Sequence, residues 1–258
     1  MNQNSNYDSI YLDKSFLYDL PDKKITNYKE VRNKKILLVG GGTARDVYFL
    51  SQKNLIINIE NSIEAAKVAN TKSIYSILQN VEDVFPIEEN YFDIVVAKDI
   101  IEHLNNPENT MNEIHRVLKK NGYLVISVPN HFYFSMRLRI LTGSNLIWKT
   151  IGHDHTKLFR EWNYMHRIFF TWKGFKEFIQ STHFRITKYF WDIGTLSHYN
   201  DLEIVQNYLI NKNKKKYTAL SYIIKVFNLL FPKRLRSKIA SISPSFFSAC
   251  FYIWCEKI

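Results

Sequence analysis

A glycine-rich turn and a carboxylate further along the chain are the residues whose types and spacing could bind a ligand. Gly40, Gly41 and Gly42 follow the apolar run Ile36–Val39, and Glu60 ends the next apolar run, 20 residues after Gly40. Glycine permits backbone torsions and close ligand approach that a side chain would block. A carboxylate at this offset can accept hydrogen bonds from both hydroxyls of a ribose. We therefore predict a nucleoside site at this turn.

The residues after the turn exclude two common phosphate sites. The dinucleotide pattern G-x-G-x-x-G would require glycine at Arg45, and a P-loop would require Gly-Lys-Ser/Thr where the chain has Gly42–Thr43–Ala44–Arg45. The predicted ligand is therefore a nucleoside without a pyrophosphate. We expect a helix from about Ala44 to Gln52, whose first N–H groups would face the ligand.

Strand-like and helix-like segments alternate after residue 34, which is typical of a parallel sheet covered on both faces. We predict an α/β fold: a Rossmann-like, seven-stranded, mostly parallel sheet with an antiparallel last strand, and helical or aromatic insertions after strand 5 and between strands 6 and 7. The predicted strands span residues 36–39, 55–59, 73–78, 92–97, 123–128, 184–191 and 246–256. The predicted helices span residues 44–52, 62–70, 172–181 and a segment that begins at Pro107 and ends before Gly122.

Five segments in this order resemble the class I S-adenosylmethionine-dependent methyltransferases, of the type 11/23 group that acts on small molecules and glycans. The resemblance covers roughly residues 34–130. The segments are Leu38–Ala44, Glu60–Ser62, Glu82–Val95, Ala97–Leu104 with its post-strand Leu-Glu-His-Leu-like part, and Glu113–Val128. The resemblance implies S-adenosylmethionine as cofactor and methyl transfer as the reaction.

The resemblance also implies which residues bind the cofactor. The glycine turn would hold the methionine part, Glu60 the ribose, the region around Asn80 the adenine, and Ala97 and Lys98 would lie near the sulfonium. The full predicted set is Gly40, Gly41, Gly42, Thr43, Asp46, Glu60, Asn61, Asn80, Val81, Glu82, Ala97, Lys98, Asp99 and His103. For Asp99 and His103, capping and packing of the following helix is the alternative interpretation.

Three positions depart from the family pattern. Leu38 stands where the family usually has a carboxylate that helps to hold the ammonium group of the cofactor, so a charge-assisted contact is absent. Asp46 or Asp99 could compensate for it. Ala44 replaces the last glycine of the turn, and Asn80 replaces an adenine-side aspartate.

Histidines in the second half are the candidate general bases for a hydroxyl acceptor, because an unperturbed imidazole titrates near neutral pH. The candidates are His131, His153, His155 and His166, with His155 and His166 ranked first and His131 retained as catalytic. His153 and His155 could also chelate a metal, but the sequence offers no third spaced ligand. We therefore expect no metal site.

Charge divides the chain into two unequal halves. Residues 1–130 carry 15 Lys/Arg and 17 Asp/Glu, whereas residues 131–258 carry 20 and 7 and contain all five tryptophans. We expect residues 1–33 to form a helical lid or cap and residues 34–258 to form the methyltransferase domain. Within it, residues 131–171 would be a substrate-side insertion and residues 212–240 a basic amphipathic helical insertion.

The basic insertion suggests an acceptor at an anionic surface. A basic amphipathic helix can lie on an anionic membrane, and the alternative is an ordinary helix packed on the sheet. We hypothesise an enzyme of glycan biosynthesis that methylates a hydroxyl of a small molecule or of a lipid-linked or surface glycan. The competing hypotheses are a nucleic-acid methyltransferase, which would also use basic and aromatic residues, and a non-catalytic protein of the same fold.

The sequence also predicts a location for the protein. The polar start from Met1 to Asp8 has no basic-then-apolar leader pattern, and the longest apolar stretch, near Phe246 to Cys255, is shorter than the roughly 20 residues of a membrane span. Two cysteines, Cys250 and Cys255, imply no disulfide framework. We expect a cytoplasmic protein, with peripheral contact with the inner membrane face as a hypothesis.

Overall fold

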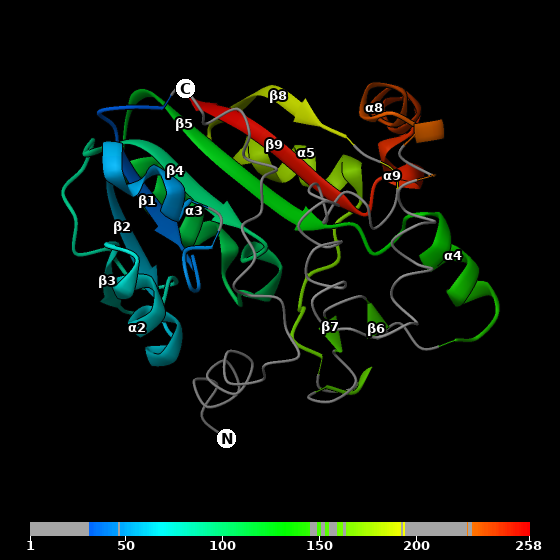
Figure 1. The fold of residues 1–258 in the computed structure, drawn as a ribbon, viewed down its shortest axis with the longest axis horizontal. Helices are drawn as coiled ribbons and strands as arrows, with labels where there is room; N and C mark the ends of the chain where they lie inside the picture. The colour runs from blue at the N-terminus through cyan, green and yellow to red at the C-terminus, as the bar shows by residue number, and fades with distance from the viewer. Residues whose placement is uncertain are drawn as a thin grey trace.

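The computed structural model describes residues 31–45, 47–144, 149–150, 153–154, 159–161, 164–191, 193, 226 and 229–258. Within these residues a central sheet is flanked by helices on both faces (Figure 1). Most of the predicted lid, residues 1–30, lies outside the described part of the chain, as does most of the predicted basic insertion at 212–240.

The sheet has seven strands in the order β3-β2-β1-β4-β5-β9-β8. Strands β1 to β5 pair in parallel, and β9 pairs antiparallel with both β5 and β8. The predicted fold class, with an antiparallel last strand, is therefore confirmed. The bounds are β1 Lys35–Val39, β2 Leu55–Glu60, β3 Tyr75–Leu78, β4 Phe92–Lys98, β5 Leu118–Pro129, β8 Phe184–Phe190 and β9 Cys250–Lys257.

Alternating side chains of the strands build two apolar layers, as the period of two in a strand requires. One layer joins Leu37, Val95 and Leu124 to the helices α3 (Pro107–Val117) and α5 (Trp172–Ser181). The other joins Ile36 and Ile94 to α2 (Ile63–Thr71) and the 3-10 helix η2 (Tyr48–Lys53). The parallel strands are thus buried on both sides, which explains their continuous apolar runs.

Two predicted elements differ from the structure. The helix expected from Ala44 to Gln52 is wrong: only η2 forms, and Ala44 before it has a left-handed backbone (φ +55°) that an α-helix excludes. The last strand begins at Cys250 and not at Phe246, because Pro244–Phe247 forms the short helix α9, with proline at its first turn. The predicted α5 agrees with the structure at both ends.

The insertion after β5 lies beyond the carboxyl ends of β4 and β5 (Figure 1). It contains α4 (Phe134–Leu141) and the two-residue strands β6 (Lys149–Thr150) and β7 (His153–Asp154), which pair with each other. Helix α8 (Lys233–Ile242) precedes α9. Among the described residues, the helices are too short or too polar to cross a bilayer.

Candidate active site

The glycine turn follows β1 directly and is packed closely. Gly40 and Gly42 have positive φ angles of 62° and 55°, which favour glycine. A Cβ atom added to Gly40 would lie 2.6 Å from Cδ1 of Ile100, the residue that precedes the turn η3 (Ile101–His103). At Gly41 it would lie 2.5 Å from Oδ1 of Asn58. Side chains from β2 and from the end of β4 therefore enclose this turn, and a larger residue would displace them.

Two side chains of β2 hold the turn in place by hydrogen bonds. Oδ1 of Asn58 accepts from the Gly41 N–H at 3.1 Å, and Nδ2 of Asn58 donates to the Gly42 carbonyl oxygen at 3.1 Å. Oε2 of Glu60 accepts from the Gly42 N–H at 2.8 Å. Oε1 of Glu60 accepts from the N–H groups of Asn61 and Ser62 at 2.9 and 2.8 Å. The buried carboxylate thus faces the turn, as predicted from the spacing.

The end of β4 lies beside the turn and carries a second polar group. Asp99 has a left-handed backbone (φ +49°), and its Oδ1 accepts from the hydroxyl of Ser127 on β5 at 2.8 Å. The Asp99 N–H donates to the Ser127 carbonyl oxygen at 3.0 Å. The two parallel strands therefore fix Asp99 at the carboxyl edge of the sheet, where ligands of open α/β sheets bind.

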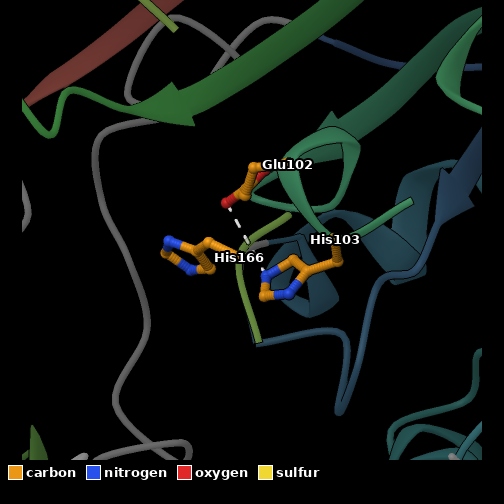
Figure 2. Close-up of side chains that lie close together, drawn as sticks. All are labelled: Glu102, His103 and His166. Carbon is orange, nitrogen blue, oxygen red and sulfur yellow. Dashed lines mark ion pairs between the residues drawn. The ribbon is translucent and has the colours of Figure 1, made fainter. Parts of the chain in front are cut away.

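Beyond Asp99, η3 and the segment 164–168 form a cluster of ionisable groups (Figure 2). Glu102 is only 1% exposed, and its Oε1 lies 3.7 Å from Nε2 of His103. Nε2 of His131 lies 2.7 Å from Nδ1 of His166, and the rings of His103 and His166 meet edge to face at 4.7 Å between centroids. The structure thus brings two of the three predicted catalytic histidines together. The third, His155, lies outside the described residues.

Comparison with known proteins gives the family. Residues 37–126 match the family described as methyltransferase domain. This range contains the glycine turn, Glu60 and the Glu102–His103 pair. The chain carries a class I methyltransferase domain. The family uses S-adenosylmethionine, so the predicted family and cofactor are both confirmed.

Individual relatives support the same domain. An uncharacterized protein of Methanocaldococcus jannaschii is 33% identical over 92 residues, which is 36% of this chain and 43% of that protein. The chain thus aligns with less than half the length of that relative. A solved S-adenosylmethionine-dependent methyltransferase of Methanosarcina mazei has a TM-score of 0.54 at 14% identity, covering 91% of this chain and 96% of that one.

A second solved structure shares the fold. It is phosphoethanolamine N-methyltransferase 2 of Haemonchus contortus in complex with S-adenosyl-L-methionine, with a TM-score of 0.53 at 15% identity. The alignment covers 90% of this chain and 51% of that one. At these identities the two structures show a shared fold.

The methyltransferase domain fits its cofactor at the turn. The tight approach at Gly40 and Gly41 leaves no room for side chains, and Glu60 provides a carboxylate beside the turn. Ala44 takes a left-handed backbone where the family pattern has glycine, so the position keeps the glycine-like conformation. In the described residues between the turn and β2 only the 3-10 helix η2 forms, and side chains of β2 hold the turn.

Other predicted cofactor residues of the methyltransferase domain have structural contacts. The Glu82 carboxylate accepts from the N–H groups of Asn105 and Asn106 at 2.8 and 2.6 Å. Asn80 Oδ1 accepts from the Glu82 N–H at 3.1 Å, and Val81 is buried. The Glu82 contacts connect this loop to the start of α3. A role in adenine binding stays a prediction for these three residues.

The remaining predicted residues lie around the same edge. Thr43 is buried, and its carbonyl oxygen accepts from Nζ of Lys72 at 3.0 Å. Ala97 is fully buried, and Lys98 ends β4. The predicted residue Asp46 is outside the described part of the chain.

Leu38, the departure from the family pattern, is 2% exposed and belongs to the apolar layer next to η2. It therefore contributes packing where the family usually has a charge. A substitute for that charge among the acidic residues near the turn stays a prediction.

Burial shifts the pKa values of several ionisable side chains in the cluster. Desolvation, together with the nearby Asp99 carboxylate, raises the pKa of Glu102 well above its usual range. Desolvation lowers the pKa of His131 to about 4, so this imidazole is neutral at pH 7. Desolvation also raises the pKa of Tyr164, whose ring lies 4.6 Å from that of His166.

Sequence reasoning missed three site residues. Asn58 is fully buried and interrupts the apolar run of β2, and this interruption was the available signal. Glu102 was part of the recognised motif but was not assigned a role. Tyr164 carried no sequence signal, because the contact with His166 depends on how the insertion folds back over the sheet.

Proposed function

We propose that this protein transfers the methyl group of S-adenosylmethionine to a hydroxyl group of its acceptor. The observation that carries the proposal is the 2.8 Å hydrogen bond between the Gly42 N–H and Glu60 Oε2, which places the turn and the carboxylate at one edge of the sheet. The histidine cluster follows β4 and β5 at the same edge. Cofactor-binding and acceptor-binding groups are thus neighbours, as a direct transfer requires.

The protein would contribute to this reaction mainly by aligning the acceptor oxygen, the methyl carbon and the sulfur. The positively charged sulfur leaves readily as a neutral thioether. The acceptor oxygen would therefore bond to the methyl carbon in line as the carbon–sulfur bond breaks, while the acceptor hydroxyl loses its proton to a base. His166 is the candidate proton acceptor, and neutral His131 at 2.7 Å would hold its ring in place. The buried cluster would also keep water from the methyl group.

Cofactor binding is the first test. We expect the full chain to bind S-adenosylmethionine in calorimetry, and we expect Glu60→Gln to weaken binding by about 10-fold to 100-fold because charge-assisted hydrogen bonds are lost. Glu64→Gln, on α2 four residues later, is the control and should bind like the parent chain. A parent chain that does not bind S-adenosylmethionine would refute the proposal and support the non-catalytic alternative.

Proton transfer is the second test. With acceptor saccharides or lipids that carry free hydroxyls, His166→Ala should lower turnover about 100-fold while leaving cofactor affinity within twofold. His183→Ala, at the end of α5, is the matched histidine control. Equal turnover in His166→Ala and the parent chain would remove His166 as the base.

Exposed apolar side chains on α4, inside the insertion, and on α8 support a lipid-linked glycan as the acceptor. On α4, Leu138 and Leu141 are 62% and 83% exposed, and on α8 Ile242 is 80% exposed. The rings of Phe134 and Phe246 lie 6.1 Å apart and connect α4 with α9. Exposed basic residues accompany these apolar ones, namely Arg137, Arg234 and Lys238. This combination matches an anionic membrane surface.

Vesicle binding tests the role of these side chains. We expect binding to vesicles that contain anionic lipid at low salt, with little binding to neutral vesicles. The double variant Leu138→Glu/Leu141→Glu should weaken binding at least 10-fold, whereas Val84→Glu, at a side chain that is 76% exposed elsewhere, should not. A salt-sensitive shift of RNA in the absence of vesicle binding would instead favour a nucleic-acid acceptor.

A further inference from the structure

The carboxylate of Glu102 lacks the partners that a buried charge requires. Glu102 is 1% exposed, and within the described part of the chain neither Oε1 nor Oε2 has a hydrogen-bond partner. Taking a carboxylate out of water is unfavourable unless a cation or hydrogen-bond donors compensate. The fold places such a group at the carboxyl edge of the sheet, so a compensating group is expected there.

Two histidines from different segments lie around this carboxylate (Figure 2). One ligand atom each from Glu102, His103 and His166 lies within 4.8 Å of the others. His103 comes from η3, and His166 comes from the segment that returns after the insertion. In a tetrahedral zinc site with bonds of about 2.0–2.2 Å, ligand atoms are roughly 3.3 Å apart. A contraction of the trio by at most about 1.5 Å would therefore produce coordination distances.

Hydrogen bonds hold the ligand-bearing segments and rings in position. The Glu102 carbonyl oxygen accepts from the N–H groups of Arg167 and Ile168 at 2.7 and 3.1 Å, which joins η3 to the segment carrying His166. Nδ1 of His103 lies 3.2 Å from the carbonyl oxygen of Met165.

Nδ1 of His103 can bond to the Met165 carbonyl oxygen only as an N–H donor. In a neutral ring Nε2 of His103 is then an acceptor, and it lies 3.7 Å from Oε1 of Glu102. Two acceptors that face each other favour a cation between them. Metal-binding histidines commonly have such a hydrogen bond on their second nitrogen. The pair of His166 and His131, at 2.7 Å, is a second contact of this kind.

We propose that Glu102, His103 and His166 bind a divalent transition-metal ion, with Zn²⁺ the best match to two imidazoles and one carboxylate. Three protein ligands leave a fourth position open for an oxygen ligand, as in catalytic zinc sites. This site departs from our expectation of no metal, which considered only the His153–His155 segment. If the proposed methyl transfer holds, an acceptor hydroxyl at the open position would lose its proton to solvent more readily, and His166 would then contribute to the reaction as a metal ligand and not as the proton acceptor.

Direct metal binding tests the site. The full chain, without a histidine tag and after chelator treatment, is titrated with Zn²⁺ in a calorimeter and with Co²⁺ in a spectrophotometer. We expect one tight site and a visible Co²⁺ band typical of low coordination number. Glu102→Gln keeps the shape of the side chain and should weaken Zn²⁺ at this site at least 100-fold. His166→Ala should do the same.

The control is His115→Ala, which removes a histidine on α3 that contacts His183 and Phe184. It should keep Zn²⁺ affinity within twofold. Unchanged Zn²⁺ affinity and stoichiometry in Glu102→Gln would overturn the proposal. To verify folding, circular dichroism of Glu102→Gln should match the parent chain, and Zn²⁺ should raise the thermal midpoint of the parent chain only.

The metal site and the proposed reaction can fail separately. S-adenosylmethionine is titrated into the same metal-free and Zn²⁺-loaded samples. Tight Zn²⁺ binding that depends on Glu102, without cofactor binding, would keep the metal site and refute the methyltransferase proposal. Cofactor binding together with absent Zn²⁺ binding would refute the metal site alone.

Discussion

Replacing Asn58 by alanine should weaken both the fold and the cofactor site. The change removes two hydrogen bonds to the glycine turn, one at Gly41 and one at Gly42, each 3.1 Å long. Each bond contributes about 0.5–1.5 kcal/mol, and an unpaired buried group costs about 1–3 kcal/mol, so we expect a loss of about 2–4 kcal/mol in the free energy of unfolding. For a chain of this size this loss corresponds to a decrease of about 4–16 °C in Tm.

The assay compares two alanine variants of the same residue type. Urea unfolding followed by circular dichroism gives the free energy, and calorimetry gives the Kd for S-adenosylmethionine, which should rise about 10-fold because the turn is no longer preorganised. Asn70→Ala is the control, because Asn70 is exposed and its Oδ1 accepts a single hydrogen bond, from the Ser76 N–H, within the described part of the chain. Its free energy should change by less than about 0.5 kcal/mol. If Asn58→Ala matched Asn70→Ala in both measurements, Asn58 would not hold the turn.

Three further variants test other parts of the structure. Gly41→Ala would place a Cβ 2.5 Å from Asn58 Oδ1, so we expect calorimetry to show at least a 10-fold loss of S-adenosylmethionine affinity. Gly174→Ala is the control and should keep the affinity, because its Cβ would make only an ordinary 3.4 Å contact with Thr171 Oγ1. Ser62→Ala removes the α2 cap, whose hydroxyl accepts from the Ala65 N–H at 3.2 Å, and should cost about 0.5–2 kcal/mol in urea unfolding, while a loss below about 0.3 kcal/mol would contradict this role. Hydrogen bonds from the Arg116 side chain and the Phe85 N–H hold the pKa of Glu113 below its usual 4.5. The ionised Glu113 therefore stabilises the fold above pH 4.5, and this stability is lost as the pH falls through the lowered pKa. Glu113→Gln should flatten the decrease in Tm below pH 4.5, and parallel Tm profiles of the variant and the parent chain would refute this.

The strands of the sheet were predicted well because strands that are buried on both faces have continuous apolar runs in the sequence. Apolar runs such as Ile94–Val96 are typical of strands that are buried on both faces, and the proline at residue 107 correctly predicted the start of α3. The spacing between Gly40 and Glu60 predicted that Glu60 would lie beside the glycine turn, because the carboxyl ends of neighbouring parallel strands share an edge of the sheet.

The errors arose where tertiary contacts override local pattern. A helix after the turn was expected from the alternation of strands and helices, but the left-handed backbone at Ala44 is incompatible with an α-helix that begins there. The cluster around Glu102 was not predicted, because His166 is 64 residues away in sequence and reaches the cluster through tertiary contacts such as the backbone bonds of Arg167 and Ile168 to Glu102. Residue types alone carry no information about such a long-range contact.

The position of β9 inside the sheet has a consequence for the order of synthesis. Residues Cys250–Lys257 lie between β5 and β8 in the sheet, so β8 can join the sheet only after this later segment has been synthesised. Strands made earlier, β1 to β5, can pair with each other while translation continues. The sheet is therefore completed only when β9 pairs with both neighbours, and a nascent chain stalled before residue 250 would leave the edge of β5 open to aggregation with other chains.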